Sequence, residues 1–129
     1  MAYVTRSDLA DRYGPAWVEQ RESMLPADAV EKAIADASAV ADDFLAGRYS
    51  VPVAPVPETL KRLVCDISRY YLAGDTADDD TRRRHNDAIA ALRDIGAGRR
   101  RLGVEPVAGG GADATVEIVS SPRVFRRPL

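Results

Sequence analysis

Apolar residues recur at helical spacing along most of the first hundred residues of the chain. In the segment PADAVEKAIADASAVADDFLAG, an apolar stripe advances in steps of four, three, four and three through Val30, Ile34, Ala37, Ala41 and Phe44. These steps place the stripe on one side of a helix with 3.6 residues per turn. Most of its side chains are small, so we expect a neighbouring helix to approach it closely.

The segment after Pro57 predicts a second amphipathic helix. Proline is tolerated in a first helical turn, and Gly74 marks the expected end. The apolar positions of this helix are Leu60, Leu63, Val64, Ile67 and Tyr70 or Tyr71. The opposite, charged face is expected to carry Lys61, Arg62, Asp66 and Arg69. We expect the apolar face to pack on the first stripe, with Leu63, Val64 and Ile67 against Val30, Ile34 and Ala41.

Start and stop signals predict two or three further helices. Thr5 can cap a helix with Asp8 three residues later, and Gly14 followed by Pro15 ends it and starts a short second one. The acidic run Asp78–Asp80 suits the positive end of another helix. That helix carries Ile89, Leu92 and Ile95 and is expected to fray at GAGRRR. The total is four or five helices, with no convincing strand up to Leu102.

A proline-rich loop joins the two central helices. The stretch GRYSVPVAPVPET contains Pro52, Pro55 and Pro57. Prolines restrict the freedom of the unfolded loop and so lower the entropy cost of one fixed geometry. We therefore expect a stiff elbow at the middle of the chain.

The last quarter of the chain has a different composition. From residue 104 onward it is rich in Gly, Pro, Ser and Val, and only ATVEIV alternates like a strand. At 129 residues the chain has the length of one domain. We predict an all-α fold: a small bundle of four to five helices over residues 1–103 with an extended, Gly-rich C-terminal arm over 104–129.

Charge is unevenly distributed between these two parts. The formal net charge is −2, but residues 99–129 hold six arginines against three acidic residues. The tail therefore carries +3 and the body −5, which is typical of a tail that docks on a partner. The residues expected to make that contact are Arg123, Val124, Phe125, Arg126 and Arg127. For a second cluster, Arg99, Arg100 and Arg101, two interpretations stay open: a solvated surface, or a contact with protein or DNA.

The residues that usually carry chemistry are sparse. With one histidine and one cysteine, the chain offers no His/Cys metal site and no recognisable catalytic group. His85 is expected at a solvated helix position, and Cys65 as a buried, inert thiol. We expect no enzyme activity, no cofactor and no bound metal. No signal peptide and no apolar run long enough for a membrane span are visible, which indicates synthesis and use in a cytoplasm.

The order of these features resembles the Mu-like prophage head-tail connector (adaptor or head-completion) proteins. The resemblance rests on YVTRSDLADRYG, on DDFLAGRYSVPVAPVPETLKRLVCDISRYYL, on RRHNDAIAALRDIGAGRRRLG and on the terminal SPRVFRRPL. It covers nearly the whole chain, and it is most specific from Asp43 to Leu72.

The resemblance implies a structural protein of the virion neck. Such a subunit forms a ring, usually of twelve copies, beneath the portal protein. It extends the channel through which packaged DNA passes and receives the tail through a stopper or tail completion protein. It implies neither enzyme activity nor membrane contact. Two other functions stay open: a small prophage DNA-binding regulator that uses the arginine clusters, and an assembly chaperone absent from finished particles. The ring number, the host and the state of the free subunit also stay open.

Overall fold

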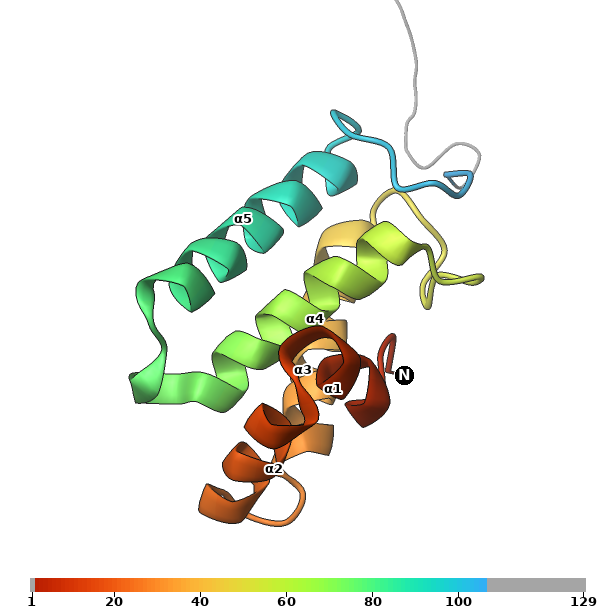
Figure 1. The fold of residues 1–129 in the computed structure, drawn as a ribbon. Helices are drawn as coiled ribbons and strands as arrows, with labels where there is room; N and C mark the ends of the chain where they lie inside the picture. The colour runs from red at the N-terminus through yellow and green to blue at the C-terminus, as the bar shows by residue number, and fades with distance from the viewer. Residues whose placement is uncertain (1, 107–129) are drawn as a thin grey trace, which may run out of the picture.

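The computed structural model describes residues 2–106. These residues fold into five α-helices and a short 3-10 turn, and they contain no strand (Figure 1). The elements are α1 (Arg6–Tyr13), α2 (Pro15–Met24), α3 (Ala29–Leu45), α4 (Glu58–Ala73), η1 (Gly74–Thr76) and α5 (Asp79–Gly96). The all-α prediction is confirmed, with the helix count at the upper of the two predicted values. The predicted arm lies outside the described residues from position 107 onward.

The helix boundaries follow the local signals of the sequence. Thr5 and Asp8 form a reciprocal capping box at the start of α1. Gly14 adopts a φ of 96°, which a residue with a side chain rarely tolerates, and Pro15 occupies the first turn of α2. The Asp78 carboxylate accepts hydrogen bonds from both the backbone N–H and the hydroxyl of Thr81, so it caps α5.

Helix α4 is the centre of the bundle. It packs against α3 on one side and α5 on another, and α1, which pairs with α2, crosses it near its middle (Figure 1). The predicted stripes meet in one buried cluster, which contains Val30, Ile34, Ala37 and Ala41 of α3 and Leu60, Leu63, Val64 and Ile67 of α4. At the end of α3 the buried residue is Leu45, whereas Phe44 is only half-buried at the edge of the core. Helix α5 contributes Leu92 and Ile95.

The proline elbow, residues 46–57, is held by the N-terminal segment of the chain. The buried Tyr3 donates its hydroxyl hydrogen to the Asp42 carboxylate on α3 and accepts a hydrogen bond from the Val53 N–H of the elbow at 2.9 Å. Its own N–H donates to Ser38 Oγ at 3.1 Å. One tyrosine therefore joins the chain start, α3 and the elbow, and the elbow's geometry depends on this bridge as well as on its prolines.

Helices α3 and α5 come closest where both of them end. At Gly96 a Cβ atom would lie 2.1 Å from the backbone oxygen of Phe44, which is well inside van der Waals contact. Only glycine permits this approach. The close contact brings the loops that follow α3 and α5 together at one end of the bundle.

Candidate arginine-lined site

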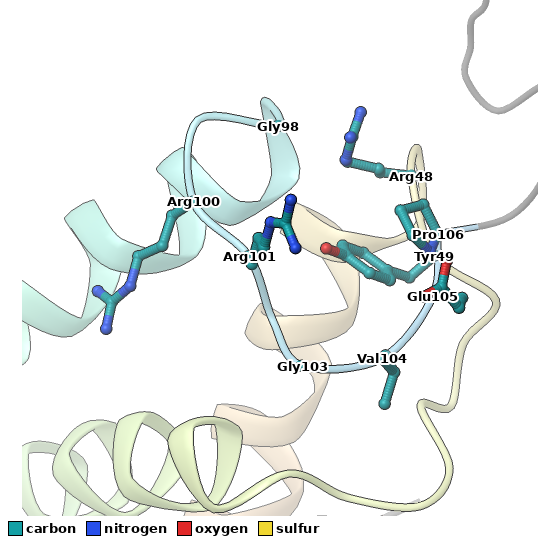
Figure 2. Close-up of a pocket in the computed structure, with 9 residues that line it drawn as sticks. All are labelled: Arg48, Tyr49, Gly98, Arg100, Arg101, Gly103, Val104, Glu105 and Pro106. Carbon is teal, nitrogen blue, oxygen red and sulfur yellow. The ribbon is translucent and has the colours of Figure 1, made fainter.

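The end of the bundle where α3 and α5 meet holds a hollow of about 510 Å³. Arg48 and Tyr49, which follow α3, and the segment from Arg100 to Pro106, which follows α5, line it (Figure 2). The Arg101 side chain points toward the buried Tyr49, and the Arg48 side chain extends toward the turn at Gly98, whereas the Arg100 side chain points away along α5 (Figure 2). The structure thus brings together two arginines that are 53 positions apart.

Of the predicted cluster of three arginines, one forms an ion pair within the described residues and two do not. Arg99 pairs with the Asp94 carboxylate at 2.9 Å. Within residues 2–106, no acidic group lies within ion-pairing distance of Arg100 or Arg101. That this cluster contacts protein or DNA stays a prediction; the structure places Arg48 beside it, in the lining of the same hollow as Arg100 and Arg101.

Two further arginine-lined hollows continue from this end of the bundle. The first, about 250 Å³, lies between α4 and α5, and Arg100 lines it as well. The second, about 320 Å³, includes Tyr13 and Trp17, and Arg84 is shared between the two hollows. Since neighbouring hollows share a lining arginine, we call the three together the arginine groove; its arginines are Arg12, Arg48, Arg62, Arg69, Arg83, Arg84, Arg100 and Arg101. It includes three acidic residues, Asp66, Asp87 and Glu105, so it carries +5 in a chain of net charge −2.

Half of the groove's arginines have an acidic neighbour within ion-pairing distance. Asp80 contacts Arg83, Arg84 and Arg69, and Arg12 lies 3.9 Å from Glu58. The remaining four have no ion-pair partner within the described part of the chain; we call Arg48, Arg62, Arg100 and Arg101 the unpaired arginine patch. Sequence reasoning missed Arg48 and Arg62 because no local cluster marks either residue.

Asp66 lies below the middle of the groove, and the prediction that it sits on a charged, exposed helix face is wrong. Its side chain is buried, at 6% exposure, and it accepts a hydrogen bond from the Tyr13 hydroxyl at 2.6 Å. Burial and this hydrogen bond raise the pKa of Tyr13. The guanidinium of Arg69 lies over the Tyr13 ring, 4.8 Å from its centre. Helix α1 covers that part of α4, so a carboxylate at position 66 meets a tyrosine instead of water.

His85 also departs from its predicted environment. It is half-buried and stacks on Tyr70, with 4.1 Å between ring centres and 19° between ring planes. Tyr71 lies further away, at 6.1 Å. The single histidine therefore contributes to the contact between α4 and α5, and it is not a freely solvated side chain.

Cys65 is fully buried in α4, as predicted. Burial raises the pKa of its thiol to about 11, so the reactive thiolate is disfavoured at neutral pH.

Among residues 2–106 there is no group of three His, Cys, Asp or Glu side chains placed to hold a metal ion. No helix in the described part of the chain is both long enough and apolar enough to cross a membrane. The predicted arm contacts Arg123, Val124, Phe125, Arg126 and Arg127 lie outside the described residues.

Fold and groove together define a class: a small helical protein that carries a patch of arginines without ion-pair partners among residues 2–106. The comparisons with known proteins then give its family. The model of the Bacteriophage Mu Gp36 family matches residues 3–118, which is most of the chain, and the protein belongs to that family.

Two relatives agree with this assignment. Mu-like prophage FluMu protein gp36 of Haemophilus influenzae (strain ATCC 51907 / DSM 11121 / KW20 / Rd) is 35% identical over 108 residues, covering 79% of this chain and 76% of the relative. Gene product J of Escherichia phage Mu is 33% identical over an alignment of 135 residues, covering 98% of this chain and 96% of the relative. The resemblance to a Mu-like phage protein family is confirmed.

Proposed function

We propose that this protein is a structural subunit of the head-tail junction of a Mu-like phage particle. The observation that carries the proposal is the match to the Mu Gp36 family over residues 3–118, which includes the elbow and the helices on both sides of it. In the proposed role the subunit forms a ring, twelve-fold as in the connector proteins it resembles. The ring sits beneath the portal protein, continues the DNA channel and receives the tail through a stopper or completion protein.

The fold is suited to a role of this kind. A subunit in a ring must present the same faces to every neighbour, so its surface elements need fixed positions. The Tyr3 bridge joins the elbow to α3, and the Gly96 contact fixes the ends of α3 and α5 relative to each other. The role requires no catalysis, and we propose that the protein is not an enzyme.

The first experiment measures whether the protein is part of finished particles. Quantitative mass spectrometry of purified virions should find it at a copy number matching that of the portal protein. Its absence from purified particles would exclude the connector role and favour an assembly chaperone. The arginine groove gives the DNA-binding regulator its best support. A regulator would be absent from virions and would bind duplex DNA with an affinity that falls steeply as salt rises.

The second experiment tests the arm. Deleting residues from Gly109 onward should leave the helical body folded, with unchanged helical circular dichroism, and should prevent stable attachment to heads. The single change Phe125→Ala should weaken attachment in the same direction, because aromatic anchors often dominate docking energy. If the truncated chain still gives tailed, infectious particles at normal levels, the arm is not the docking element.

A further inference from the structure

The unpaired arginine patch calls for an anionic partner that the described part of the chain does not supply. Four arginines line two hollows of about 510 and 250 Å³, and none of the four has an acidic group of residues 2–106 within ion-pairing distance. Like charges gathered on one surface repel each other and weaken the folded state slightly. A partner that brings negative charge into these hollows removes that repulsion.

The shape and charge of the hollows favour carboxylates on a protein surface over the phosphates of a nucleic acid. A duplex backbone presents an unbroken row of negative charges. Such a row laid along the groove would meet Asp87 and Glu105, which are exposed among the arginines. Single carboxylate side chains can enter a hollow one at a time and form paired hydrogen bonds with a guanidinium, while they avoid the acidic positions.

A second copy of the same chain offers such carboxylates. Because the groove carries +5, the rest of the chain carries −7. On the outer side of α3, Asp36 and Asp43 are exposed, and neither has an ion-pair partner among residues 2–106. They lie seven residues apart, which places them on one face about 10 Å from each other. The exposed Ala39 between them leaves room for a close approach.

We propose that the unpaired arginine patch of one copy receives Asp36 and Asp43 of the next copy. This inference rests on the proposed function, since it names the surfaces through which the ring would form. The patch and the acidic face of α3 are different surfaces. A copy that uses its patch on one neighbour keeps its acidic face for another neighbour, and this head-to-tail pattern forms a ring when the rotation between successive copies closes. Arginine is the cation that interfaces favour.

The test uses the scarcity of lysine in this chain, which has only Lys32 and Lys61. The change Arg101→Lys keeps the positive charge and introduces an amine that a zero-length carbodiimide reagent can couple to a touching carboxylate. Full-length chains carrying this change are mixed in normal and nitrogen-15-labelled form, coupled at high protein concentration and digested. Mass spectrometry then identifies the coupled peptides. The matched control is Arg99→Lys, whose amine should couple within one chain to Asp94, the present partner of Arg99.

The expected result is a mixed-isotope crosslink from the introduced amine to Asp36 or Asp43, in products that extend beyond two copies. Reversing the acidic face with Asp36→Arg and Asp43→Arg should lower that crosslink about tenfold, a change equivalent to the loss of one or two interfacial charge pairs. The proposal is overturned if the control couples to Asp94 while no crosslink reaches α3 of a second chain. Coupling only to carboxylates of the same chain would also overturn the proposal, because another part of the protein would then occupy the patch. Products that stop at two copies would exclude the head-to-tail pattern.

Duplex DNA is the remaining alternative occupant. The same full-length chain is titrated with a short duplex at two salt concentrations. The proposal is overturned if the chain binds the duplex with a salt-dependent affinity that Arg100→Glu and Arg101→Glu abolish, and if no crosslink to α3 forms. That result would assign the patch to phosphate. Because coupling is measured on the purified chain, its failure is distinguishable from failure of the connector role, which is measured on particles.

Discussion

Replacing Tyr13 by phenylalanine removes a single hydroxyl group from the contact between α1 and α4. That hydroxyl is the one hydrogen-bond donor that the Asp66 carboxylate has among residues 2–106. Asp66 is 6% exposed, so little water can replace the lost bond. Hydrogen bonds to charged groups contribute roughly 1.5–3 kcal/mol, and a buried acceptor left unpaired costs about the same. We expect Tyr13→Phe to lower the free energy of unfolding by about 1.5–3 kcal/mol.

Urea unfolding at pH 7, followed by circular dichroism, measures this change directly. For a domain of this size, 1.5 kcal/mol corresponds to a fall in Tm of at least about 6 °C. The matched control is Tyr71→Phe, because Tyr71 is 37% exposed and its hydroxyl makes no hydrogen bond within the described residues. A surface change of this kind should alter stability by less than about 0.5 kcal/mol.

A double change separates the hydrogen bond from general packing. If the loss in Tyr13→Phe comes from the stranded carboxylate, then adding Asp66→Asn should cost less than the sum of the two single changes, because a neutral amide is cheaper to leave unpaired. Strict additivity, or a loss below about 0.5 kcal/mol in Tyr13→Phe alone, would refute the view that this hydrogen bond stabilises the bundle.

Three further predictions follow from the core and the buried hydroxyl and thiol groups. The fully buried Ile67 should cost about 2–5 kcal/mol when changed to alanine, as measured by urea unfolding. The change Gly96→Ala should destabilise by about 1–3 kcal/mol, because the added methyl group would collide with the Phe44 carbonyl, and a thermal melt detects this. Burial raises the pKa of Cys65 from 9.0 to about 11 and that of Tyr3 from 10.0 to about 12. Because both folded-state pKa values are raised, the contribution of these two groups to the free energy of unfolding is fully present below pH 9 and is lost as the pH rises toward 12. Urea unfolding midpoints measured from pH 8 to 12 would follow this loss.

Each of these predictions can be contradicted by a specific result. A loss below about 0.5 kcal/mol in Ile67→Ala would mean that this face of α4 is not buried in solution. Wild-type stability in Gly96→Ala would mean that α3 and α5 do not approach so closely. The alkaline loss should become shallower in Cys65→Ser and in Tyr3→Phe, and an unchanged slope in both variants would show that neither group causes it.

The sequence by itself determined the helices of this protein. Apolar residues at steps of three and four placed α3 and α4, while Thr5, Pro15 and Asp78 marked helix starts that the structure confirms. These signals are local, because a capping side chain acts on backbone groups within one turn and an apolar stripe depends only on helical geometry. The family resemblance depended on the same local runs.

Only the tertiary structure decided which faces meet. Tyr3 bonds to Asp42 and Val53, 39 and 50 positions away, and Asp66 is buried because α1 covers it. The hydrophobic pattern says that a face is buried, but burial is non-directional and does not select the covering element. In the same way, Arg48 and Arg101 form one site only because Gly96 allows α3 and α5 to converge. A local cluster marks Arg100 and Arg101 in the sequence, whereas their grouping with Arg48 and Arg62 is a consequence of packing between distant segments.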